Sequence, residues 1–241
     1  MEAQKMTIET RNLEYEIDGK SYEAVIAGSG GKHPAVLVAH AWAGRSEFEV
    51  DKAKALAELG YAGVAIDLYG KGVLGSSTEE NQALMAPFVK DRAMLQARLL
   101  KVIDVVKEQP EADATKIAAI GFCFGGLCVL DIARTGADIS GVVSFHGLLG
   151  APGNLSGQKI NAKVLALHGW DDPMAPPADV EAFGKEMTEA KADWQLHAYG
   201  GVMHAFTNLA ANDPGFGTVY DACADRRSWS AMRNFLSEIF Q

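Results

Sequence analysis

The chain has 241 residues, of which 48% are hydrophobic, and this composition is consistent with one large domain around a sizeable core. A formal net charge of −9 argues against nucleic acid as a partner, because a protein that binds a polyanion needs a basic face. No stretch approaches the ~18 apolar residues that a membrane span requires, and Met1–Arg11 is too polar for a secretory signal.

Short β-branched runs alternate along the chain with Gly- or Pro-marked loops and longer amphipathic segments. This alternation predicts an α/β fold in which residues 1–241 form a single domain, with a mostly parallel sheet flanked by helices on both faces. In chain order we expect strands at Thr7–Ile17, Tyr22–Ala27, Ala35–Ala39, Gly63–Ile66, Ile117–Ile120, Gly141–Phe145, Val164–Leu167 and Trp194–Tyr199. Tyr22–Ala27 is predicted to be an outer antiparallel strand.

Two capping boxes mark helix starts. Ser46-Glu47-Phe48-Glu49 opens a helix to about Leu59, and Ser77-Thr78-Glu79-Glu80 opens a long helical region that ends near Pro110. Further helices are predicted at Phe124–Arg134, Pro177–Ala190 and Tyr220–Phe240. The Gly- and Ser-rich segment 70–77 is either a mobile rim of a cleft or an ordinary loop.

Cys123 lies in the most informative segment, Gly121-Phe122-Cys123-Phe124-Gly125-Gly126. A buried strand runs directly into this Gly-x-Cys-x-Gly pattern and a helix follows, which is typical of a nucleophile elbow with cysteine in place of serine. Such a turn is so tight that the residues two before and two after the nucleophile must be small, and both are glycines. The N-terminal N–H groups of the helix favour a thiolate and can receive an oxyanion, with the Phe124 amide as the first donor. The alternative is that Cys123 is a small, inert core residue.

Two later strand ends supply an acid and a base in the chain order that follows a nucleophile elbow. Asp171 and Asp172 follow Val164–Leu167, and His204 follows Trp194–Tyr199 and a Gly-Gly loop. Like Cys123, they lie past the C-terminal ends of strands, where open α/β sheets bind ligands. The histidine would take the thiol proton and the carboxylate would fix its tautomer, a role for which the residues alone leave both aspartates open.

Histidines and cysteines elsewhere do not indicate a metal site. His40, His146 and His168 each follow a strand and could face the same cleft, but no two of them have the usual ligand spacing. The three cysteines, Cys123, Cys128 and Cys223, suit neither a disulfide framework nor a zinc site, which indicates a reducing cytoplasm. We interpret His33 and His197 as structural.

At this point the chain resembles the dienelactone hydrolase family, the carboxymethylenebutenolidase-like branch of the α/β-hydrolases, over nearly its whole length. The resemblance rests on Asp67-Leu68-Tyr69, the segment around Cys123, His168-Gly169-x-x-Asp172-Pro173-x-x-Pro176 and Tyr199-Gly200-x-x-x-His204-Ala205-Phe206. It implies a thiol that attacks a lactone or ester carbonyl, an acyl-thioester intermediate, and no metal or organic cofactor. It also favours Asp172 over Asp171 as the acid and implies the Trp42 amide as second oxyanion donor.

The chain departs from the family pattern at two places. Well-studied members carry a glutamate, thought to help activate the thiol, where this chain has Ala41, and His40 could substitute for it. The two arginines that hold a substrate carboxylate correspond to Lys71 and Asn208, and a lysine lacks the bidentate fork of arginine. A neutral or bulkier ester or lactone is therefore at least as good a candidate as dienelactone.

The residues expected to border the small-molecule substrate are His40, Lys71, His146 and Phe206. Alternatives to ester hydrolysis are thioesterase or peptidase activity on the same triad, or a non-catalytic thiol sensor or ligand-binding protein. The oligomeric state is left open by the sequence.

Overall fold

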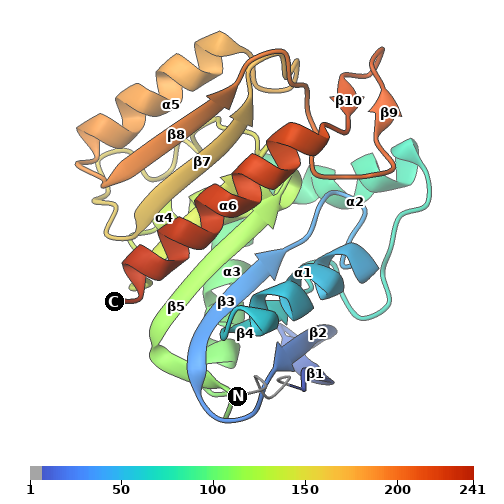
Figure 1. The fold of residues 1–241 in the computed structure, drawn as a ribbon, viewed down its shortest axis with the longest axis vertical. Helices are drawn as coiled ribbons and strands as arrows, with labels where there is room; N and C mark the ends of the chain where they lie inside the picture. The colour runs from blue at the N-terminus through green and yellow to red at the C-terminus, as the bar shows by residue number, and fades with distance from the viewer. Residues whose placement is uncertain (1–6) are drawn as a thin grey trace, which may run out of the picture.

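Eight strands form one twisted sheet in the computed structural model, which describes residues 7–241 (Figure 1). The strands are β1 (Glu9–Ile17), β2 (Lys20–Gly28), β3 (His33–Ala39), β4 (Ala62–Ala65), β5 (Ala112–Phe122), β6 (Gly141–Phe145), β7 (Lys163–Gly169) and β8 (Trp194–Tyr199). All eight predicted strands are present. Most of the parallel strands are buried along their length, as expected for a sheet covered on both faces.

The strand order is β1-β2-β4-β3-β5-β6-β7-β8. β1 and β2 are antiparallel to their neighbours, and all strands from β3 to β8 run parallel. The mostly parallel sheet and the antiparallel direction predicted for Tyr22–Ala27 are confirmed, although the edge strand is β1 and β2 lies one place further in. The chain leaves β3 toward β4 and returns to its other side as β5, and such a reversal opens a crevice beyond the C-terminal ends of the two strands. The topology thus directs attention to the loops after β3 and β5.

Helices cover both faces, as predicted (Figure 1). The helices are α1 (Glu47–Glu58), α2 (Thr78–Lys90), α3 (Arg92–Lys107), α4 (Phe124–Arg134), α5 (Pro177–Glu189) and α6 (Ala222–Ile239). Side chains of α1 and α6, such as Leu56 and Phe235, share one apolar cluster. Side chains of α3, α4 and α5, such as Leu99, Leu130 and Phe183, share the other.

The helical region predicted from Ser77 to Pro110 is two helices rather than one. Asp91 ends α2 and caps α3, because its carboxylate accepts a hydrogen bond from the Met94 amide at 2.9 Å. The sequence also gave no expectation of the short hairpin of β9 (Asn212–Asp213) and β10 (Thr218–Val219). Its Asp-Pro-Gly turn, Asp213-Pro214-Gly215, is a recognisable turn signal that could have predicted it.

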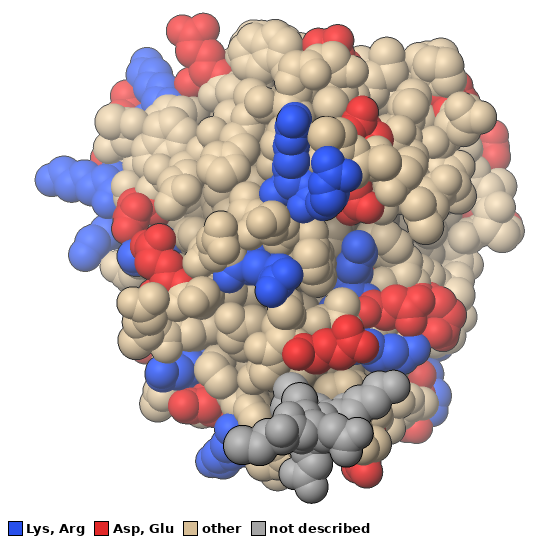
Figure 2. Space-filling view, in the orientation of Figure 1, with Lys and Arg blue, Asp and Glu red and all other residues tan. Residues whose placement is uncertain are grey.

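The expectation of no secretory signal rests partly on residues 1–6, which lie outside the described part of the chain. Among residues 7–241, no helix combines the length and apolar character needed to cross a bilayer. On the face seen in Figure 2, basic side chains are interspersed with acidic ones rather than gathered into a single patch.

A buried ionic network ties the helix that follows Cys123 to its neighbours. Asp131 of α4 is fully buried and accepts hydrogen bonds from Arg92 Nε at 2.7 Å and Arg134 Nη1 at 3.3 Å. Arg134 also donates to both carboxylate oxygens of Glu186 on α5, at 2.9 and 2.7 Å. One carboxylate therefore connects α3, α4 and, through Arg134, α5.

Replacing Asp131 by alanine should lower the free energy of unfolding by about 3–5 kcal/mol, because it leaves the largely buried Arg92 guanidinium without a carboxylate and Arg134 with Glu186 alone. Urea denaturation of Asp131→Ala beside the wild type measures the effect. Asp104→Ala, on the exposed face of α3, is the matched control and should change the free energy by no more than about 0.5 kcal/mol. Equal effects of the two substitutions would contradict the stabilising role of the network.

Candidate active site

The tight turn at Cys123 brings the end of β5 and the start of α4 against the end of β3. A Cβ atom built on Gly125 would lie 2.1 Å from the Ala39 carbonyl oxygen, and one on Gly121 would lie 2.1 Å from the Gly125 carbonyl oxygen. Only glycine fits at either position without displacing backbone, so the predicted need for small residues around Cys123 is confirmed. This close approach places Cys123 beside the loop that follows β3.

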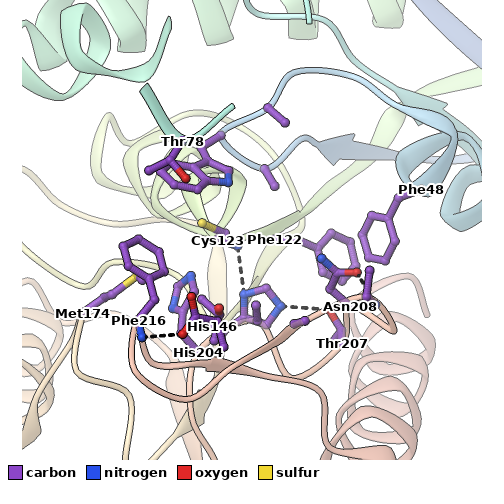
Figure 3. Close-up of a pocket in the computed structure, with 18 of the residues that line it drawn as sticks. Phe48, Thr78, Phe122, Cys123, His146, Met174, His204, Thr207, Asn208 and Phe216 are labelled. Carbon is purple, nitrogen blue, oxygen red and sulfur yellow. Dashed lines mark hydrogen bonds between the residues drawn. The ribbon is translucent and has the colours of Figure 1, made fainter. Parts of the chain in front are cut away.

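Cys123 adopts a backbone conformation that non-glycine residues rarely occupy, with φ 56° and ψ −114°. Its amide N–H is shared between the Phe145 carbonyl oxygen at 3.0 Å and His146 Nδ1 at 3.1 Å. The side chain is only partly buried and lines a cavity of about 1000 Å³. The thiol is therefore held at the N-terminus of α4 and is open to a ligand (Figure 3).

His204 and Asp172 meet next to this cysteine. Nδ1 of His204 lies 2.7 Å from Asp172 Oδ2, and both side chains are almost fully buried. Asp172 Oδ1 accepts a hydrogen bond from the Met174 amide at 2.8 Å, which fixes the carboxylate. Asp171 is exposed and its side chain does not line the cavity, so the geometry agrees with the family resemblance in selecting Asp172.

The β9–β10 hairpin holds His204 in position. The His204 amide donates to the Gly217 carbonyl at 3.0 Å, and the Val219 amide donates to the His204 carbonyl at 3.0 Å. Nε2 of His204 is buried and forms no hydrogen bond with any residue that the structure describes. That nitrogen is therefore available to the Cys123 sulfur, which lies nearby in Figure 3.

Burial by itself would lower the pKa of His204, but the adjacent Cys123 sulfur and the hydrogen-bonded Asp172 carboxylate more than offset this and raise it to about 10. An imidazole with this pKa carries a proton throughout the neutral range. It can therefore stabilise a thiolate and deliver a proton to a leaving group.

The two backbone amides expected to donate to an oxyanion have no hydrogen-bond acceptor among the described residues. Phe124 is the first residue of α4, so its N–H has no intrahelical acceptor. No hydrogen-bond acceptor is found for the Trp42 amide among residues 7–241. The loop that carries Trp42 is held in place by a hydrogen bond from the Tyr69 hydroxyl to the Trp42 carbonyl oxygen, at 3.0 Å.

Three of the four residues expected to border the substrate lie outside the cavity lining, which corrects that expectation. His40 is fully buried, with Nδ1 bonded to the Ala41 carbonyl and Nε2 to the Leu68 amide, so it has no free nitrogen for the thiol either. Phe206 is fully buried as well. Lys71 is exposed and pairs with Glu14 and Glu23 instead.

His146 does line the cavity, but both of its ring nitrogens are occupied. Nδ1 accepts the Cys123 amide proton, so Nε2 must carry the ring proton and donate it to Thr207 Oγ1 at 2.8 Å. Burial, with a smaller contribution from nearby His204, lowers the pKa of His146 well below its usual range. His146 is thus a neutral group that orients the elbow.

Glu49 lines the cavity, a position that its capping-box pattern does not indicate. The predicted capping box is present, since Glu49 Oε2 accepts from the Ser46 amide and hydroxyl, each at 2.8 Å. Its other oxygen, Oε1, accepts from the Ala41 amide at 3.3 Å, and the side chain lies in the cavity wall almost fully buried. The helix cap therefore also fixes the loop that presents the Trp42 amide.

Comparison with known proteins agrees with this architecture. The model of the dienelactone hydrolase family matches residues 22–240. An uncharacterized Caenorhabditis elegans protein is 37% identical over 149 residues, which are 61% of this chain and 94% of that protein. A provisional carboxymethylenebutenolidase of Aquifex aeolicus is 26% identical over 229 residues, covering 92% of this chain and 96% of the relative. The crystal structure of a dienelactone hydrolase-like promiscuous phosphotriesterase from metagenomic libraries is 34% identical and superimposes with a TM-score of 0.90, covering 97% of this chain and 99% of that one.

The matched region includes Cys123, Asp172 and His204, and the family match bears out the resemblance seen in the sequence. The architecture is that of the α/β-hydrolases. The chain belongs to the dienelactone hydrolase family and is a carboxylic-ester hydrolase.

Proposed function

We propose that this enzyme hydrolyses a small carboxylic ester or lactone with Cys123 as nucleophile, His204 as base and Asp172 as the acid that orients it. The observation that carries the proposal is the 2.7 Å bond between Asp172 and His204, which leaves the second ring nitrogen buried and unbonded beside the thiol. The three unpaired cysteines are compatible with a reducing compartment such as the cytoplasm.

In the first half of the reaction the Cys123 sulfur attacks the carbonyl carbon, and the carbonyl π electrons move onto oxygen. The Trp42 and Phe124 amides stabilise this oxyanion. The tetrahedral intermediate then collapses, the C–O bond to the leaving group breaks, and protonated His204 gives its proton to the departing alkoxide. The product is an acyl-thioester on Cys123.

In the second half His204, now neutral, removes a proton from a water molecule that attacks the thioester carbonyl. Collapse of this second intermediate breaks the C–S bond and restores the thiolate and the protonated imidazole. Asp172 keeps its negative charge throughout and compensates the imidazolium each time it forms. In a lactone, the alcohol and the acid formed are two ends of one product.

Phosphotriesters are a second candidate class of substrate. The favouring observation is the similarity along nearly the whole chain to a structure described as a promiscuous phosphotriesterase. Attack by the same thiol on phosphorus would place a developing negative charge on the phosphoryl oxygen, which the same two amides could stabilise. A dialkyl 4-nitrophenyl phosphate, assayed beside an ester, tests this possibility.

Cys123→Ala should reduce hydrolysis of 4-nitrophenyl butyrate by at least about a thousandfold, because it removes the thiol proposed to form the acyl intermediate. Iodoacetamide should inactivate the wild type to a similar extent. Cys223→Ser is the matched control, since Cys223 lies on α6 away from the cavity lining, and it should keep both activity and sensitivity to iodoacetamide. Activity that survives in Cys123→Ala would remove Cys123 as the nucleophile, and a wild type inactive on esters and lactones would favour a thiol sensor.

The raised pKa of His204 predicts a loss of activity in alkaline solution. The proton that leaves with the alcohol is present below a pH of about 10 and is lost as the pH rises through that value. The same sign applies to stability: the favourable pairing of protonated His204 is complete below its ordinary pKa of 6.5 and disappears as the pH passes about 10. The measurement is kcat/KM for ethyl butyrate against pH, corrected for spontaneous hydrolysis.

Asp172→Asn should shift the alkaline limb of the pH profile, which is the fall of kcat/KM at high pH, to lower pH by roughly one unit or more. The reason is that the substitution removes the carboxylate that raises the pKa of His204. The substitution should also lower the rate at every pH, since the amide no longer enforces the productive tautomer. Asp171→Asn changes the adjacent exposed carboxylate and should leave the limb in place. A limb that does not move in Asp172→Asn would contradict the proposed pairing.

A further inference from the structure

The wall of the cavity beside Cys123 lacks the long basic side chains that bind a substrate carboxylate. Among the described residues that line it, none is a lysine or an arginine. Asn208, which corresponds to an arginine position in the family pattern, is uncharged and exposed on the wall. A ligand in this cavity therefore meets no cation that is free to pair with it.

Cations close to the site are occupied elsewhere. Arg45, directly after the Trp42 loop, donates to the Glu23 carbonyl oxygen and carboxylate, each at 2.9 Å. Lys52 lies behind the cavity wall, with Nζ 5.0 Å from the centre of the Phe48 ring and 4.9 Å from that of Trp229. The positive charge of His204 is compensated by Asp172 and by the Cys123 sulfur.

Apart from His204, which is paired with Asp172, the ionisable side chains that could charge the wall are acidic. Glu49 and Asp213 both line the cavity. Both carboxylate oxygens of Glu49 accept hydrogen bonds from Ser46 and Ala41, and the negative charge of this carboxylate lies in the wall. Asp213 accepts a hydrogen bond from the Phe216 amide at 2.9 Å and so holds that aromatic residue in place (Figure 3).

Much of the remaining wall is apolar. The Trp42 and Phe216 rings stack with centroids 6.0 Å apart, although they come from loops at opposite ends of the chain. Phe48, Met85 and Leu148 add further apolar surface, and Phe216 is 45% exposed. Such a wall favours a substrate that buries hydrocarbon or an aromatic group.

We propose that this cavity selects uncharged esters and lactones and rejects those that carry a carboxylate on the acyl group. The inference rests on the proposed function and specifies its substrate class. An ionised carboxylate in the cavity would lose hydration, gain no cation, and lie near Glu49 and Asp213. An isosteric uncharged group would bury apolar surface at the same place.

Two chromogenic esters with acyl chains of equal length test this directly. 4-Nitrophenyl butyrate ends in a methyl group, and 4-nitrophenyl hemisuccinate ends in a carboxylate that is ionised at pH 7.5. We expect kcat/KM for the butyrate to exceed that for the hemisuccinate by at least roughly fiftyfold. The leaving group is the same, so the ratio reports the acyl group alone.

Asn208→Arg should supply the missing cation and raise the relative kcat/KM for the hemisuccinate by about tenfold or more. Asn208→Gln extends the side chain without adding charge and is the matched control, which should leave the ratio unchanged. Because Asn208 lines the cavity, each variant is judged by the ratio of its kcat/KM values for the two esters, which cancels any common change in rate.

The outcomes separate the two proposals. Rapid hydrolysis of the butyrate with an equal or faster rate on the hemisuccinate would overturn the substrate class while the hydrolase mechanism stands. An unchanged ratio in Asn208→Arg would also overturn it, because the absence of a cation would not then be the cause. No hydrolysis of either ester would overturn the proposed function, and the substrate class with it.

Discussion

The close approach of Gly125 to the Ala39 carbonyl is the contact on which the rest of the site depends. A Cβ atom there would lie 2.1 Å from that oxygen, so helix α4 can begin directly against the end of β3 only because the residue is glycine. This contact brings the start of α4, which carries the Phe124 amide, against the end of β3 and the loop that carries Trp42. The φ of 56° at Cys123 costs on the order of 1–3 kcal/mol, and the two acceptors shared by its amide help to enforce it.

The parts of this arrangement that follow from local sequence could be predicted. The Gly-x-Cys-x-Gly pattern specifies a tight strand-to-helix turn, and buried β-branched runs specify parallel strands whose C-terminal ends share one edge of the sheet. Asp172 and His204 could be placed at that edge because each follows a strand. The choice of Asp172 over Asp171 needed the family resemblance, and the structure agrees because only Asp172 is turned toward His204.

What could not be predicted depends on contacts between segments far apart in the chain. His40 and Phe206 follow strands as Cys123 does, but packing turns both side chains into the core. Lys71 forms an ion pair with Glu14 on β1, and no local sequence pattern indicates this pairing. The β9–β10 hairpin is too short to show periodicity, and its role in holding His204 becomes visible only when Gly217 and Val219 are seen to bond it.

The replacement of the family glutamate by Ala41 fits the way this site is held together. A carboxylate is still present near the loop, but Glu49 is immobilised by three hydrogen bonds from Ser46 and Ala41 and lies in the wall as a helix cap. It cannot swing toward the thiol without releasing the loop that carries the Trp42 amide. If Cys123 is the nucleophile, its activation must therefore come from His204, whose pKa of about 10 provides a cation beside the sulfur before any substrate arrives. Activation by His204 does not depend on a substrate carboxylate, which is consistent with a cavity wall that has no lysine or arginine to bind one.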